Sequence, residues 1–78
     1  MNTYHAILGP GSDEPNHTTI FLNPEESVEE FLKQEQCITL IANVGRVKRG
    51  ERKCATPSWE HYEAEGYRVV KCQIIVVP

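Results

Sequence analysis

The segment Asn23-Pro24-Glu25-Glu26 constrains the fold more than any other part of this 78-residue chain, because it predicts where a helix begins. An asparagine side chain can accept hydrogen bonds from the free amides of a first helical turn, and proline suits the first helical position. The two glutamates complement the positive end of the helix dipole. The apolar residues that follow have the i, i+3, i+4 spacing of one stripe: Val28, Phe31 and Leu32. The sequence therefore predicts a helix over Pro24–Glu35 that packs through this stripe.

Several other segments have the pattern of β-strands. Their residues either alternate between two faces or are rich in β-branched and aromatic types. These segments are Thr3–Leu8, Thr18–Leu22, Ile38–Val44 and Tyr67–Val77. The last has one fully apolar face, which is typical of a central strand.

Turn and cap residues complete the predicted order of elements. Thr56-Pro57 indicates the start of a short second helix, and Gly66 is expected to end it. Lys48-Arg49-Gly50-Glu51 is expected to form a hairpin turn. We therefore predict one α+β domain over residues 1–78, with a four- to five-stranded mixed sheet packed by one main helix and a short second helix.

This order of elements resembles the ubiquitin-like β-grasp. The residues from Thr18 to Val28, TTIFLNPEESV, are similar to the junction between the second strand and the helix in that superfold. The resemblance implies that the last strand inserts centrally beside the first. The chain ends in Val76-Val77-Pro78 and not in Gly-Gly, so the resemblance does not extend to conjugation or sulfur-carrier activity.

The alternation of apolar residues predicts which side chains form the core and which form the opposite face of the sheet. The expected core residues are Tyr4, Leu8, Ile20, Leu22, Leu40, Ala42, Val70, Ile74 and Val76. The residues expected on the other face are Ile7, Ile41, Ile75 and Val77. An exposed apolar cluster of this kind is typical of a protein-binding or homodimer surface, although scattered surface hydrophobic residues need no such explanation.

Charge is strongly segregated along the chain. Residues 1–45 hold seven acidic residues and one basic residue, whereas residues 46–53 hold five basic residues and one acidic residue. The basic cluster consists of Arg46, Lys48, Arg49, Arg52 and Lys53. Such a cluster steers association with an acidic surface. We therefore predict that these residues, with Ile41 and Ile75, contact a partner protein.

Nucleic acid is the alternative partner for the basic cluster. Its five cations could contact phosphates, and Trp59, Tyr62 or Tyr67 could stack on bases. The whole chain has a net charge of −3, however, whereas nucleic-acid-binding domains are usually basic. The glutamates of the predicted helix, Glu25, Glu26, Glu29, Glu30 and Glu35, could in turn imitate phosphates for a basic target, but helix stabilisation and solubility explain them more simply.

The sequence predicts no metal site, cofactor or catalytic centre. The three cysteines, Cys37, Cys54 and Cys72, lack the close pairs of structural zinc sites, and their odd number argues against a disulfide framework. Cys54 and His61 could be imagined as a thiolate pair, but no orienting third group is recognisable. We find no signal peptide and no apolar run that could cross a bilayer, so a reduced, cytoplasmic protein without membrane contact is expected.

These observations favour a non-catalytic domain that binds another protein or protein complex. Small, charge-polarised chains of this kind resemble the inhibitor and accessory proteins of phages and mobile elements, including anti-CRISPR and other anti-defence proteins. A nucleic-acid-binding accessory module that uses residues 46–53 is the alternative function.

Overall fold

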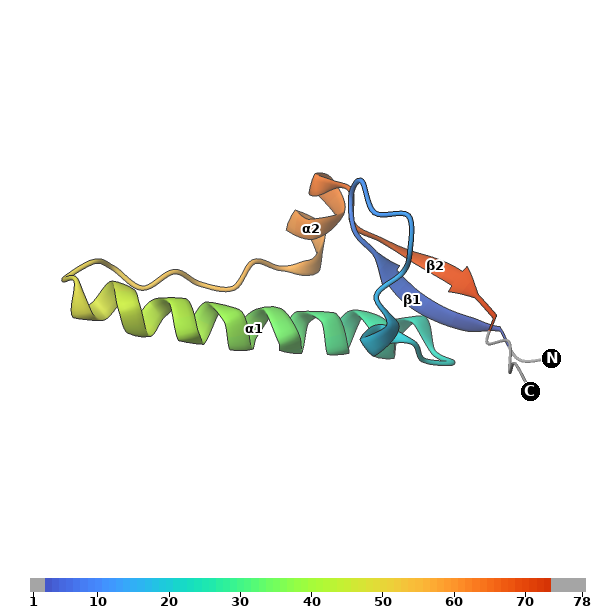
Figure 1. Ribbon diagram of the computed structural model, residues 1–78, viewed down its shortest axis with the longest axis horizontal. Coiled ribbons are helices and arrows are strands. Elements are labelled where there is room, and N and C mark those ends of the chain that lie inside the picture. Colours follow the sequence, from blue (N-terminus) through green and yellow to red (C-terminus); the bar gives the residue numbers. More distant parts are fainter. Residues whose placement is uncertain (1–2, 74–78) are drawn as a thin grey trace.

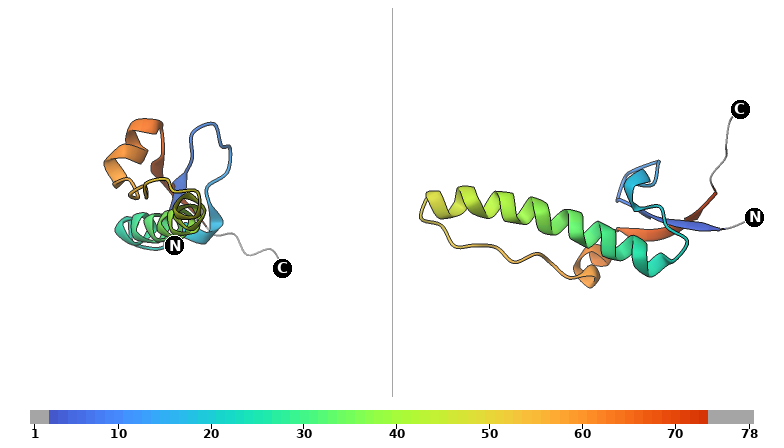
Figure 2. Two further views of the ribbon diagram at one scale, coloured as in Figure 1. Left: turned by 90° about the vertical axis from the view of Figure 1, so that its left-hand side faces the viewer. Right: turned by 90° about the horizontal axis from the view of Figure 1, so that it is seen from below.

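The computed structural model in Figure 1 describes residues 3–73. The elements, in chain order, are β1 (Tyr4–Leu8), the 3₁₀ helix η1 (His17–Thr19), α1 (Pro24–Lys48), α2 (Trp59–Glu65) and β2 (Arg68–Cys72). β1 and β2 pair in antiparallel orientation, with Tyr4 opposite Cys72 and Leu8 opposite Arg68. The pair packs against the first half of α1 (Figure 2).

The predicted start of the main helix is confirmed. Asn23 is the N-cap of α1, and its side chain accepts a hydrogen bond of 2.9 Å from the amide of Glu25. The hydroxyl of the buried Ser27 donates to the carbonyl of His5 at 2.9 Å, which fixes the first turns of α1 against β1. The predicted stripe faces the core: Phe31 is buried, and Val28 and Leu32 pack beside it.

α1 continues to Lys48, so the strand predicted over Ile38–Val44 is wrong. No glycine or proline interrupts the chain between Pro24 and Gly45, and each residue added to an existing helix gains a hydrogen bond at low cost. The hydroxyl of Thr39 also donates to the carbonyl of Glu35, at 2.9 Å within the helix. β-branched residues favour strands only where a pleated, packed neighbour is present, and no described strand lies beside this segment.

The four- to five-stranded mixed sheet is also wrong, because the described residues form a two-stranded antiparallel sheet. Thr18–Leu22 folds as η1 followed by a single bridge between His5 and Phe21. Asn16 drives this outcome, since its side chain accepts from both the amide and the hydroxyl of Thr18, at 3.0 and 2.7 Å. These local bonds compete with a strand ladder. The β-grasp order is therefore absent from residues 3–73.

The end of α2 is confirmed at Gly66, which has a φ of 107° in the left-handed region. The helix begins at Trp59, two residues after the predicted proline, with Ser58 as its N-cap residue. The carboxylate of Glu60 accepts hydrogen bonds from its own backbone amide and from Ser58, which lowers the pKa of Glu60. α2 thus begins without a side-chain capping bond from Ser58, and it places Trp59 and Tyr62 against Phe31 of α1.

The core is an aromatic cluster around Phe31. Its ring contacts those of Trp59, Tyr62 and Tyr67 with centroids 5.7, 5.0 and 5.2 Å apart. Ile7 and Ala6 of β1 are also buried. Ile7 was expected on the outer face of a sheet, which is wrong, and Tyr62 was not among the expected core residues.

The other expected core residues lie elsewhere. Tyr4, Leu8, Ile20 and Val70 are half-buried, while Leu22, Leu40 and Ala42 are exposed. The reason is the single helix: because α1 runs past the sheet, the residues after Glu35 have no layer to pack against. Ile74, Ile75, Val76 and Val77 lie outside the described residues.

Candidate protein-binding surface

The second half of α1 exposes large apolar side chains. We call residues 37–48 the distal half of α1. Five aliphatic residues in it are 52–73% exposed: Ile38, Leu40, Ile41, Val44 and Val47. The distal half projects away from the sheet, as Figures 1 and 2 show. A contiguous apolar face on a helix is typical of a protein interaction site.

Four residues of the distal half lie on one face of the helix. Cys37, Leu40, Val44 and Val47 are spaced three, four and three residues apart, which is the spacing of a coiled-coil seam. Leu40, Val44 and Val47 line a groove of about 350 Å³ together with Asn43, Lys48 and Lys53. The floor of this groove is aliphatic, and two lysines stand at its rim.

An extended chain forms the other side of the groove. We call residues 49–58 the return segment, because they run back beside α1 to the start of α2 (Figure 2). The side chain of Asn43 accepts from the amide of Cys54 at 2.8 Å and donates to its carbonyl at 2.9 Å. Arg46 Nε donates to the carbonyl of Arg52 at 2.7 Å. These three bonds attach the return segment to the distal half of α1.

The five basic residues gather at the far end of α1, although not in the predicted hairpin. Arg46 and Lys48 lie on the last turn of α1, Arg49 is its C-cap, and Arg52 and Lys53 belong to the return segment. Positive side chains are favourable at the C-terminal end of a helix, where the backbone carbonyls concentrate negative charge. The helix continues where the hairpin was expected, and Gly50, with a φ of 76°, turns the chain after it.

We call these five basic residues the basic end of the molecule. Glu51 partly neutralises their charge. Its carboxylate lies 3.1 Å from Arg49 and 3.9 Å from Arg46. In the described part of the chain, no carboxylate lies within ion-pair distance of Lys48, Arg52 or Lys53. These three exposed cations remain available to a negatively charged partner.

The structure thus places Ile41 and the five basic residues on the same projecting part of the molecule, whereas Ile75 lies outside the described residues. Sequence reasoning missed Leu40, Val44 and Val47 as surface residues, because it assigned two of them to a strand facing the core. The signal that could have found them is the three-four-three spacing from Cys37 to Val47, which is helical and continues the helix that begins at Pro24.

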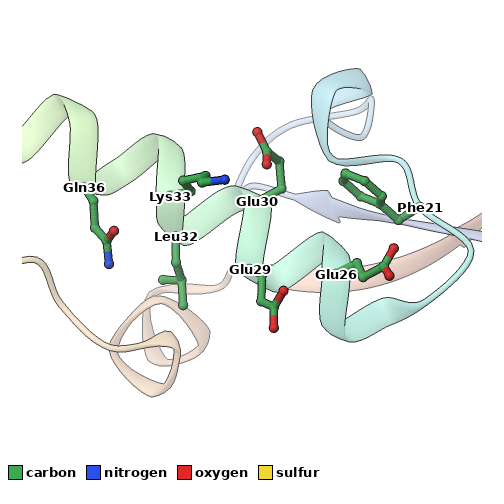
Figure 3. Close-up of a pocket in the computed structure, with 7 residues that line it drawn as sticks. All are labelled: Phe21, Glu26, Glu29, Glu30, Leu32, Lys33 and Gln36. Carbon is green, nitrogen blue, oxygen red and sulfur yellow. The ribbon is translucent and has the colours of Figure 1, made fainter.

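A second groove, of about 540 Å³, lies on the first half of α1 and is shown in Figure 3. Its acidic residues are Glu26, Glu29 and Glu30, and Lys33 is the one cation among its lining residues. Phe21, Leu32 and Gln36 complete it. The surface of α1 therefore changes from acidic near its start to apolar and then basic at its end.

The remaining ionisable and nucleophilic groups are dispersed. Among residues 3–73, no group of three His, Cys, Asp or Glu side chains is placed to hold a metal ion. Cys37, Cys54 and Cys72 are free thiols, the first two exposed. His61 pairs with Glu65 at 3.0 Å, on the same exposed side of α2. The Tyr62 hydroxyl donates to Glu35 at 3.4 Å, and burial, followed by the charge of Glu35, raises the pKa of Tyr62.

Comparison of the chain with protein-family models, with curated proteins and with solved structures found no match. None of the described helices combines the length and the apolar character that a membrane span requires.

Proposed function

We propose that this protein is a non-catalytic protein-binding domain whose docking surface is the distal half of α1. The observation that carries the proposal is the exposure of five large aliphatic side chains on one projecting helix. The partner we propose is a protein that presents an apolar helix face flanked by carboxylates. Its apolar residues fit the groove along Leu40, Val44 and Val47, and its carboxylates complement Lys48 and Lys53 at the rim.

The energetics support such docking. Complete burial of one Val, Leu or Ile side chain contributes about 1.5–3 kcal/mol. Since Leu40, Ile41, Val44 and Val47 are 52–73% exposed in the free chain, covering these four contributes about 4–7 kcal/mol before the cost of association. The basic end adds long-range attraction, which acts mainly on the rate of association.

The position of the aromatic residues favours protein over nucleic acid as the partner. Base stacking needs exposed rings, but Tyr62 is buried, and Trp59 and Tyr67 are partly buried against Phe31. Two of the five cations also share Glu51 as a counterion. The basic end is therefore better suited to carboxylates at a protein surface than to tracking a phosphate backbone.

The same proposal includes the setting in which the protein acts. Two exposed thiols suit a reducing compartment, so we place the binding in the cytoplasm. A small binding domain without catalytic groups is suited to blocking or recruiting a larger complex. This is consistent with the resemblance to anti-defence inhibitors drawn from the sequence, and a host protein complex is the partner that this resemblance implies.

The test uses the full chain, immobilised, to capture a partner from the native host after nuclease treatment, and then the purified partner in direct binding measurements. The double variant Leu40→Ser with Val44→Ser should bind at least about tenfold more weakly, because it removes the apolar contact. Ala42→Ser, exposed on the opposite side of α1, is the matched control and should bind like the natural chain.

The basic end is tested separately by replacing Lys48, Arg49 and Arg52 together with Ser. This variant should associate more slowly, and the difference should shrink as salt is raised. A partner that binds the Leu40 and Val44 double variant as tightly as the natural chain would contradict the proposal. Capture that disappears on nuclease treatment would instead support the nucleic-acid alternative.

A further inference from the structure

We propose that the partner of the distal half of α1 is a second copy of this chain, with the two α1 helices packed antiparallel. This inference rests on the proposed function, since it takes the same surface as a docking site and names a second copy, in place of a host protein, as its occupant. The surface calls for a helix with an apolar face and neighbouring carboxylates, and α1 itself carries both. Its distal half is apolar, and the groove beside it displays Glu26, Glu29 and Glu30 (Figure 3).

The apolar residues have the spacing needed for helix pairing. Cys37, Leu40, Val44 and Val47 occupy alternating three- and four-residue steps, which keep one seam facing a neighbouring helix. Ile41 lies beside this seam and is 73% exposed. Toward the start of α1, the next positions of the same seam are Lys33, Glu30 and Glu26, so the seam turns from apolar to charged where the monomer's own core begins.

The seam defines a register for the antiparallel pair. A two-fold axis midway between Leu40 and Val44 places each Leu40 opposite the Val44 of the second copy. The same axis places each Cys37 opposite the other copy's Val47. All four seam residues of both copies are then covered, and the contact surface is self-complementary, as a two-fold interface must be.

Charge complementarity selects the antiparallel direction. In this register the last residues of one α1, Lys48 and Arg49, lie opposite Gln36 and Glu35 of the other, so the basic end of each copy approaches the acidic first half of the second α1. A parallel pair would instead bring the two basic ends together, with five cations on each, and like charges at close range oppose association. The acidic-to-basic change along α1 therefore favours a second copy in reversed orientation.

The first measurement is the mass of the full chain in solution by analytical ultracentrifugation, over about a hundredfold range of concentration. The mass should rise from that of the 8.9 kDa monomer to twice that value. Leu40→Glu should keep the chain monomeric throughout and preserve its helical circular dichroism, since Leu40 is 69% exposed. Ala42→Glu adds the same charge on the opposite side of α1 and should dimerise like the natural chain.

The second measurement tests the direction of pairing by disulfide trapping. In a background with Cys54→Ser and Cys72→Ser, the added change Val47→Cys should give a covalent dimer in high yield on oxidation. Two controls should remain uncrosslinked: the same chain with Cys37→Ser, and the background alone. Within one helix the two positions are about 15 Å apart, so no bond within a single copy competes.

The outcomes separate the two proposals. A monomer at every concentration would overturn pairing with a second copy. It would not contradict the proposed function, which is tested by binding of the captured partner to the Leu40 and Val44 double variant. Crosslinking of the background alone, through Cys37 of both copies, would overturn the antiparallel arrangement. A dimer that persists in Leu40→Glu would show that the distal half of α1 is not the interface.

Discussion

Among single residues, Tyr62 combines packing and ionisation in one side chain. Its ring meets those of Phe31 and Tyr67 edge-on, with centroids 5.0 and 5.5 Å away, and its hydroxyl reaches Glu35. Burial, followed by the negative charge of Glu35, raises the pKa of Tyr62 above its ordinary value of 10.0. The neutral phenol is therefore favoured in the folded chain.

This shift predicts a loss of stability in alkali. Since the folded pKa is the higher one, the contribution of Tyr62 is fully present below pH 10.0 and is lost as pH rises through the folded pKa. Tyr62→Phe has no phenol to ionise there, so its melting temperature should fall less than that of the natural chain between about pH 9 and pH 11. Tyr4→Phe, outside the aromatic cluster, is the control and should keep the full alkaline loss. Identical pH profiles for all three proteins would contradict the prediction.

Residue-level reasoning from the sequence succeeded where an interaction is local. The N-cap at Asn23 and the left-handed cap at Gly66 depend only on neighbouring backbone, and both were predicted. It failed at Ile7, because alternation along β1 does not say which layer covers each face. Both Ala6 and Ile7 are buried, since β1 is packed by the rest of the chain on both sides.

Among the elements, α1 is the one whose extent was predicted least correctly from the sequence. Its start was fixed by the cap, but its end depends on whether other strands compete for Ile38–Val44. In this chain the described sheet consists of β1 and β2 only, so the helix continues through a segment whose β-branched residues favour strands. The consequence is that Leu40 and Ala42, which were predicted as core residues, are exposed on α1.

The continuity of α1 predicts the effect of replacing its internal glycine. Gly45→Ala should raise the free energy of unfolding by about 0.5–1 kcal/mol, because alanine favours the helical backbone. The new Cβ would lie 3.2 Å from the guanidinium of Arg49, the mobile end of a flexible side chain that can move aside. Chemical denaturation followed by circular dichroism measures the change.

Gly66→Ala is the control for this substitution and should have the opposite sign. Its φ of 107° is strained for alanine, and the added Cβ would meet Pro10 at 3.1 Å. A loss of stability in Gly45→Ala would indicate that residues 38–48 do not form a helix in solution.

For the whole molecule, stability depends on a core that lies at one end. The buried cluster lies at one end, where α2, Tyr67 and β1 meet the first half of α1 around Phe31. Domains of this size have little stability to spare, since they bury a smaller fraction of their surface on folding than larger domains do. The distal half of α1 and the return segment add exposed apolar area without adding to this core.

The dependence on one cluster predicts that Phe31→Ala affects the entire fold. Truncating a buried phenylalanine costs about 3–5 kcal/mol, a large part of the stability expected for 78 residues. Thermal melting followed by both near- and far-ultraviolet circular dichroism should show a much lower, or absent, transition. Leu22→Ala, at a residue that is 55% exposed, should change stability by no more than about 0.5 kcal/mol. Equal effects of the two variants would show that Phe31 is not the centre of the core.

The candidate site was predicted in part at this scale. The clustering of five basic residues and the choice of Ile41 came from the sequence, and the structure brings these residues together at the far end of α1. The apolar groove could not be predicted, because it exists only where α1 outruns the sheet and the return segment lies beside it. Asn43 and Arg46, which hold that segment in place, carry no recognisable motif.

The projection of α1 beyond its core also has a mechanical consequence. From Phe31 to Lys48 the helix extends about 25 Å, so a tilt of about 10° around Phe31 displaces the basic end by about 4 Å. α1 is in this respect a lever with its pivot among aromatic rings in contact with one another. A small rearrangement of those rings is magnified at the far end, and a force applied at the far end acts on the rings with the full length of the arm.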